Sequence, residues 1–221
     1  MIPTLPSRRP TRTAVRALLA AGTISVLLAG CGLLPRSAPA RLHAVTLPAP
    51  AVAQRCAMPF SVRDLRLAGH LDRTEIVLER QGSRILAEGD DQWAAPLRAE
   101  LPRAIALALS RRLEGSRVVP HPWRFNEIPP LALSVDVERL EPEAGRLRAS
   151  LGWVLTDPAD RNRTLAHGRF ETTEAVAPTM DYGEAADAVA DAIGLVLGRF
   201  ADELAARIAA DPANDLPGRC R

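Results

Sequence analysis

Alternation of apolar and polar residues predicts a run of β-strands in the middle of the chain. In 131–138 the odd positions are leucine or valine, and the even positions are small or acidic. A period of two gives a strand one buried and one exposed face. Residues 147–155 alternate in the same way, and 164–172 predicts a third strand, with turns expected at 141–145 and 157–160. Three neighbouring strands with short links predict an antiparallel meander.

The chain before residue 90 predicts shorter strands. Residues 42–47 and 61–67 each predict a strand, and the first of them ends at a proline-containing segment. Two further runs, 75–80 and 84–88, flank a turn that contains glycine. This arrangement predicts a hairpin.

Apolar residues at helical spacing predict a helix after the hairpin. Leu97 and four later residues recur every four positions, and Pro96 suits the first turn. Pro102 either kinks this helix or marks its real beginning, because proline in a helix interior lacks the N–H donor. Gly115 suits the end of the helix.

A second and longer helix is the last predicted element. Asp181 can cap it, and Glu184 stands three residues on, which is the spacing of a capping box. Its apolar stripe runs from Tyr182 to Ile208, about 40 Å at 1.5 Å per residue. Two helices packed on one face of a mostly antiparallel or mixed sheet predict a single α+β domain, which we expect over 42–210 before a tail at 211–221.

The first thirty residues predict a bacterial lipoprotein signal peptide. Four arginines and no acidic residue occur in this segment, and 17–30 is an uncharged run of 14 residues. That run is shorter than the roughly 20 residues of a membrane-spanning helix, and it suits the apolar region of a signal peptide. It ends in the sequence Leu-Ala-Gly-Cys at 28–31, which resembles a lipobox. The alternative is a short membrane anchor that is never cleaved.

The lipobox resemblance implies that Cys31 carries the lipid anchor. In lipoproteins this thiol takes a diacylglyceryl group, the preceding peptide is removed, and the new amine is acylated. Each buried methylene adds about 0.8 kcal/mol of membrane affinity, so three chains hold the protein almost permanently. The small and proline-rich residues of 31–41 predict a flexible tether. Gly32, in place of the aspartate that favours inner-membrane retention, implies the periplasmic face of the outer membrane.

Composition excludes nucleic acid as a partner and favours a single soluble module. All 28 basic residues are arginine. Removing the four in the signal peptide leaves 24 against 26 acidic residues, a net charge of −2. No basic surface for nucleic acid is predicted from that balance. No second run of 18 apolar residues occurs, so we expect no further membrane span.

Two cysteines remain after Cys31, namely Cys56 and Cys220. The periplasm is oxidising, so these two can form a disulfide that ties the tail to the start of the domain. Two unrelated thiols are the alternative. No CxxC pair or zinc-type spacing occurs in the sequence.

No set of residues predicts catalysis, a metal site or a cofactor. The four histidines follow no metal-binding spacing, and we expect isolated surface or packed side chains; they are His43, His70, His121 and His167. Neither a nucleophile elbow nor a phosphate-binding glycine loop occurs. Glu88, Asp90 and Asp91 could attract a cation, but we expect a solvated turn there. Glu141 and Glu143 are likewise expected in a turn.

One segment resembles a known family. Leu-Asp-Arg at 71–73, Ile-Val at 76–77 and Gln-Trp-Ala-Ala-Pro-Leu at 92–97 are similar to the signature of the ABC-type transport auxiliary lipoproteins, the PqiC-like family. Gln92 replaces the usual arginine of that signature, and Ala95 replaces the usual glutamate. The tyrosine pair that relatives carry in the first strand is missing from 42–45.

The family resemblance implies a non-catalytic accessory subunit of an envelope lipid transporter. In such systems an inner-membrane permease or ABC complex is coupled to an MCE-domain protein that bridges the periplasm. The lipoprotein is then expected to dock the far end of the bridge. Relatives of this kind can form rings, so the resemblance also implies possible self-association. The competing hypotheses are a structural lipoprotein that partners an outer-membrane barrel, and a secreted hydrolase.

Leu71, Asp72, Arg73 and Trp93 are the candidate contact residues of the signature. The functional hypothesis is that these residues contact a partner protein or another subunit. The structural hypothesis, which we favour, is that they form a turn in which Asp72 and Arg73 are paired, because aspartate suits loop geometry. Trp93 is then expected to pack under the start of the first helix, and all three tryptophans in or beside the core.

Overall fold

The computed structural model describes residues 39–50, 53–56, 58–119, 121–123, 127–179 and 181–210. The chain divides after Pro39 into two units, and the fold described below is that of Ala40–Arg221. The predicted signal peptide, Cys31, Cys220 and the predicted tail lie outside the described residues.

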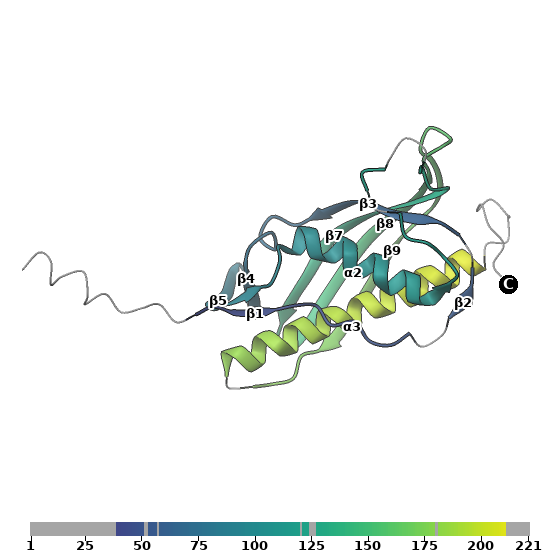
Figure 1. The fold of residues 1–221 in the computed structure, drawn as a ribbon. Helices are drawn as coiled ribbons and strands as arrows, with labels where there is room; N and C mark the ends of the chain where they lie inside the picture. Colours follow the sequence, from purple (N-terminus) through teal and green to yellow (C-terminus); the bar gives the residue numbers. More distant parts are fainter. Residues whose placement is uncertain are drawn as a thin grey trace, which may run out of the picture. The chain divides into compact units, whose positions relative to one another are not determined.

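The larger sheet has four strands in the order β3-β7-β8-β9 (Figure 1). These strands are β3 (Phe60–Leu67), β7 (Leu131–Glu143), β8 (Arg146–Asp157) and β9 (Arg163–Ala175). β7, β8 and β9 form the predicted antiparallel meander. β3 joins the edge of the sheet parallel to β7, and this makes the sheet mixed.

A second sheet has three strands in the order β1-β5-β4. β4 (Glu75–Gln81) and β5 (Arg84–Trp93) form the predicted hairpin. Gly82 turns it with a φ of 60°, a value that glycine adopts without the cost of a side chain. β1 (Arg41–His43) lies parallel to β5. The expected strand at 42–47 is therefore wrong in extent, because the chain leaves the sheet after His43.

Two helices cover one face of the larger sheet, as expected for this α+β fold (Figure 1). α2 (Leu97–Arg112) begins directly after Pro96, so Pro102 lies inside the helix and does not mark its beginning. α3 (Tyr182–Ala209) has the predicted cap, since the Asp181 carboxylate accepts from the Glu184 N–H at 3.0 Å. Neither helix is long and apolar enough to span a membrane, nor is any other among the described residues.

The core fills the space between the larger sheet and the two helices. Apolar residues on the inward faces of β7 and β8 meet the buried stripes of α2 and α3; they include Leu101, Ile105, Leu133, Leu151 and Phe200. Arg112, at the end of α2, is also buried. It donates to the Asp202 carboxylate on α3 at 2.5 and 3.1 Å, and to the Ala108 carbonyl at 3.1 Å. This ion pair fastens the two helices to each other.

The segment that follows β1 crosses α3 at two glycines one helical turn apart. A Cβ on Gly194 would collide with the backbone of Thr46, and a Cβ on Gly198 would come within 2.7 Å of the Pro48 ring. Small residues at this spacing let another backbone approach a helix closely. We refer to residues 44–50 as the strap. The strap leads to the small parallel pair of β2 (Gln54–Arg55) and β6 (Leu113–Glu114).

Candidate functional site

The chain enters the domain through β1, where Arg41 is paired with a buried carboxylate. Arg41 Nε lies 2.9 Å from Asp91 Oδ1, and Nη2 lies 2.7 Å from Oδ2. Asp91 on β5 is fully buried. A fork of two parallel hydrogen bonds is the strongest geometry between guanidinium and carboxylate.

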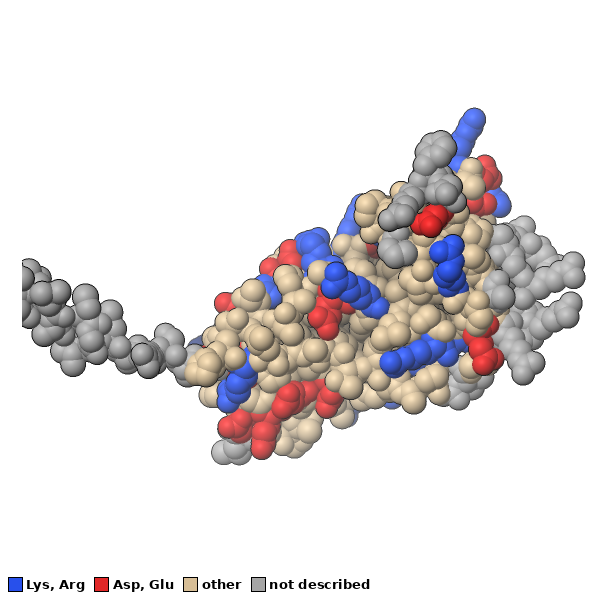
Figure 2. All heavy atoms as spheres, in the orientation of Figure 1, with Lys and Arg blue, Asp and Glu red and all other residues tan. Residues whose placement is uncertain are grey.

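His43 connects the same carboxylate to α3. Its Nε2 lies 2.7 Å from Asp91 Oδ1, and its Nδ1 lies 2.8 Å from Asp187 Oδ1. Ionised carboxylates only accept hydrogen bonds, so an imidazole satisfies both when each ring nitrogen carries a proton. Arg41, His43, Asp91 and Asp187, which we call the entry cluster, thus join β1, β5 and α3. Figure 2 shows acidic side chains gathered around the start of α3.

The entry cluster keeps Asp91 ionised despite its burial. The hydrogen bond from Arg41 lowers the pKa of Asp91, burial acts in the opposite direction, and the bond from His43 lowers the pKa further. The same bond raises the pKa of Arg41. Our expectation of a solvated turn at 88–91 is wrong, because β5 runs through these residues and Asp91 is buried. The strand continues through the acidic residues because a guanidinium 50 residues earlier in the chain neutralises the buried one.

A second buried carboxylate joins the hairpin to the larger sheet. Glu141 is 2% exposed and accepts from Arg80 Nη1 at 2.6 and 2.9 Å. His70 Nε2 lies 3.4 Å from Glu141 Oε2, and Arg139 Nε lies 3.8 Å from Glu141 Oε1. The expected turn at 141–145 is therefore shorter than predicted, since β7 extends to Glu143 and only Ala144 and Gly145 turn.

The signature segment is divided between core and surface. Leu71 is 2% and Trp93 is 6% exposed, so both pack in the core, as expected for Trp93. The predicted Asp72–Arg73 pair is wrong. Asp72 accepts from Arg98 Nη2 at 2.6 Å, and Arg73 Nε donates to Glu75 at 3.0 Å. The turn itself is confirmed at 69–73, and a partner contact through Asp72 and Arg73 stays a prediction.

The outer face of the larger sheet holds an open hollow of about 1370 Å³. Gly152, which has no side chain, is one of the residues that line it, and Asp136 and Glu138 lie beside this glycine. Arg169 crosses this point and donates to Glu138 at 2.8 Å. His167 lies at its rim. Across the part of the chain that the structure describes, no three histidine, cysteine or acidic residues are grouped as a metal site requires.

The remaining predicted residues differ in their surroundings. Trp153 is buried, with the Arg207 guanidinium 5.4 Å from its ring centre, and Trp123 makes an edge contact with His121. Cys56 is fully buried and disulfide-bonded. Because Cys220 is outside the described residues, its pairing with Cys56 stays a prediction.

Sequence reasoning missed the entry cluster. Its members come from three elements far apart in the chain: β1, β5 and α3. No local spacing predicts that Asp187 and His43, 144 residues apart, share a hydrogen bond. The one signal was an acidic run inside a strand-forming segment, which needs a basic partner if it is buried.

Solved structures share this fold at low sequence identity. A crystal structure of an uncharacterised protein has a TM-score of 0.57 and 16% identity, covering 76% of this chain and 99% of its own. A protein from Xanthomonas campestris has a TM-score of 0.54 and 18% identity, covering 76% and 94%. At such identities the likeness concerns the fold alone. No curated protein matches the chain by sequence.

The family model of the ABC-type transport auxiliary lipoprotein component matches residues 42–213. This range includes β1 except its first residue, the hairpin, the meander and both helices. It also includes three members of the entry cluster: His43, Asp91 and Asp187. The chain therefore belongs to the family of ABC-type transport auxiliary lipoproteins.

Proposed function

We propose that this protein is a non-catalytic accessory subunit of an MCE/ABC-type lipid transport system, anchored to the periplasmic face of the outer membrane. The observation that carries the proposal is the family match over 42–213. The Leu-Ala-Gly-Cys sequence at 28–31, which resembles a lipobox, ends ten residues before that match begins. An inner-membrane permease or ABC complex and a periplasm-spanning MCE protein are the proposed partners.

The entry cluster supports a role at the end of a tether. The lipid is proposed at Cys31, and β1 begins at Arg41. Ten extended residues reach about 35 Å at most, so the domain stays within that distance of its leaflet. Arg41 and His43 fasten the first residues of the domain to β5 and α3. An anchored subunit needs such a firm connection between its lipid and its folded part.

The polar clusters support a docking role over a catalytic one. Two of the buried carboxylates, Asp91 and Glu141, are held by arginines, which neutralise them. A buried carboxylate neutralised by arginine in this way connects elements of the fold. A general base, by contrast, requires a proton acceptor with access to a substrate. Neither carboxylate has that access, because Asp91 is fully buried and Glu141 is 2% exposed.

Purification from the native host tests the proposal. The full-length lipoprotein, extracted from membranes in mild detergent, is expected to bring down an MCE-domain protein and its permease. A Cys31→Ala variant serves as the control for anchoring, since it should leave the membrane fraction. Repeated recovery of no MCE protein counts against the proposal. Crosslinking to an outer-membrane barrel instead favours a structural lipoprotein of the barrel type.

A further inference from the structure

One edge of the larger sheet is only partly covered. β3 is an outer strand, and β7 lies on one side of it. On the other side the Phe60 N–H donates to the Arg117 carbonyl at 3.0 Å, and the Val119 N–H donates to the Phe60 carbonyl at 2.8 Å. From residue 62 to 67 the described residues place no strand on that side. We call this stretch the free edge.

Two hollows meet along the free edge. One is the open hollow of the outer face, and the other is a groove of about 650 Å³ between α2 and the start of β3. Both are lined by Arg63 and Pro102. Four consecutive residues of β3, 63–66, line the first hollow. Because successive side chains of a strand point to opposite faces, four in a row mean that the hollow wraps around the edge and reaches the backbone.

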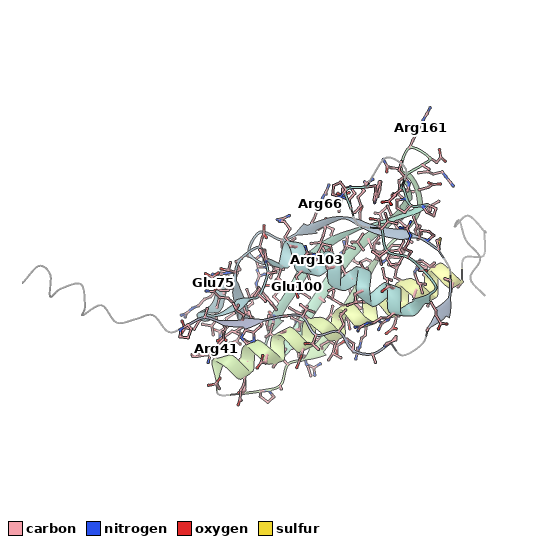
Figure 3. All side chains as sticks on the ribbon, viewed as in Figure 1. Arg41, Arg66, Glu75, Glu100, Arg103 and Arg161 are labelled. Atoms are coloured by element: carbon pink, nitrogen blue, oxygen red, sulfur yellow. The ribbon has the colours of Figure 1, made fainter. Side chains whose placement is uncertain are left out.

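Four arginines line the two hollows, which we together call the seam, and three acidic residues line the outer-face hollow beside them. Arg63 and Arg66 come from β3, and Arg98 and Arg103 come from α2; Figure 3 labels Arg66 and Arg103. Asp64, Asp72 and Glu138 are each paired with an arginine: Arg63 at 2.7 Å, Arg98 at 2.6 Å and Arg169 at 2.8 Å, respectively.

Two of the arginines remain available to a partner. Arg66 and Arg103 make no ion pair with any described residue. Asp136, the register partner of Arg66 on β7, lines the outer-face hollow. The α2 groove has no acidic residue in its lining, and its floor includes Ala106 and the half-exposed Leu107.

We infer that the free edge of β3 binds an extended, acidic segment of a protein partner as an added strand. Free N–H and C=O groups of an edge strand pair with such a segment. Carboxylates on it would meet Arg66 and Arg103, and its apolar side chains would meet Leu107. Charges on an edge strand repel apolar strands, so the same arginines select the partner. The identity of the partner rests on the proposed function, whereas the binding of an acidic segment at the free edge does not depend on it.

Peptide binding to the full lipoprotein in detergent tests the inference. The probe is a fluorescent eight-residue peptide of alternating glutamate and valine with blocked ends. Its matched controls replace glutamate by lysine, or two alternate valines by proline, which removes backbone donors. We expect the acidic peptide to bind at least tenfold more tightly than either control. Amide hydrogen exchange should slow at 62–67 in its presence.

A charge-reversal variant separates this edge from other surfaces. Arg66→Glu with Arg103→Glu should weaken the acidic peptide at least tenfold and strengthen the lysine peptide. The control, Arg84→Glu with Arg146→Glu, reverses two exposed arginines outside the seam and should leave binding unchanged. Circular dichroism confirms that both variants fold.

Four results would overturn the inference. The first is equal binding of the acidic and lysine peptides, and the second is slowed hydrogen exchange at β9 in place of β3. The third is that the Arg66→Glu, Arg103→Glu variant loses binding to phosphatidylglycerol vesicles but keeps binding to the acidic peptide. The fourth is a wild-type dimer in sedimentation that the same double variant abolishes. Failure to recover an MCE protein from the host does not change the peptide result. The two proposals therefore fail separately.

Discussion

The carbonyl of Thr46 rests on the Cα of Gly194, so closely that no side chain fits between the strap and α3. One turn later the Pro48 ring takes the same position above Gly198. The strap thus follows a groove that two glycines open along the helix. This contact joins the first residues of the domain to its last helix.

Replacing Gly194 by alanine should destabilise the protein. Alanine favours a helix over glycine by about 1 kcal/mol, but here its methyl group collides with backbone that cannot rotate away. Overpacking of this kind costs about 1–3 kcal/mol, so we expect a lower free energy of unfolding in urea. Gly198→Ala, which meets a proline ring instead, should cost less. Equal stability of Gly194→Ala and wild type would contradict the contact.

Asp91→Asn should weaken the entry cluster. Arg41 and His43 both lose their charged acceptor, but the Arg41 side chain is 53% exposed, so we expect a loss of about 1.5–3 kcal/mol, the contribution of a hydrogen bond to a charged group. Urea unfolding at pH 7 measures the loss. The neighbouring and exposed Asp90 provides the control, because Asp90→Asn should leave the stability unchanged.

The same variant should change the response to acid. The pKa of Asp91 is lowered in the folded protein. Its contribution to stability is therefore complete above the ordinary aspartate pKa of about 3.9, and it is lost as the pH falls from there through the lowered folded value. Wild type should lose stability more steeply than Asp91→Asn in this range. Parallel acid curves would show that Asp91 does not contribute.

Glu141→Gln should loosen the hairpin from the larger sheet. Glutamine keeps the shape but removes the charge that Arg80 and His70 face, and the one-third-exposed Arg80 guanidinium then lacks its counter-charge. A hydrogen bond to a charged group contributes about 1.5–3 kcal/mol, so we expect a loss of that order. Hydrogen exchange should quicken first in β4. Glu143→Gln, on a carboxylate that is one-third exposed and paired with Arg148, should have a much smaller effect.

Cys31→Ala should release the protein from the membrane. Without the thiol no diacylglyceryl group is attached, and the remaining module carries no acyl chain to hold it. Fractionation and mass spectrometry of the protein from its own host measure the change. Cys220→Ser is the matched control, since it removes a cysteine and should leave the anchor and its acyl mass in place.

Cys220→Ser should also destabilise the domain if Cys220 is the partner of Cys56. A bridge across so long a loop contributes about 4–5 kcal/mol in a chain-entropy estimate. Non-reducing peptide mapping should find the two cysteines in one linked pair. Wild-type stability in the serine variant, with Cys56 bonded elsewhere, contradicts the pairing.

Local patterns were enough to predict the hairpin, the meander and both helices. Alternation in 131–138 and the leucine spacing after Leu97 are properties of the sequence that burial on one face requires. The Asp181 cap follows the same logic, because the carboxylate and the N–H that it accepts from are three residues apart. Such features depend on neighbours in the chain.

The entry cluster and the ends of strands could not be predicted in this way. Asp91 and Glu141 occur in acidic stretches that resemble turns. Their burial is favourable only because arginines far away in the sequence pair with them. The parallel pairings of β1 with β5 and of β3 with β7 likewise join segments without a common turn. Long-range electrostatics and parallel registers have no signature within a short window of sequence.

His43 is far along the sequence from the residues that it contacts, and this affects when the domain can form. Synthesis delivers β1 early, yet its acceptors on β5 and α3 follow 48 and 144 residues later. Loops this long are slow to close. β1 can pair with β5 once residue 93 is available, but its contact with Asp187 also needs α3, so the attachment of β1 is complete only when nearly the whole chain is present.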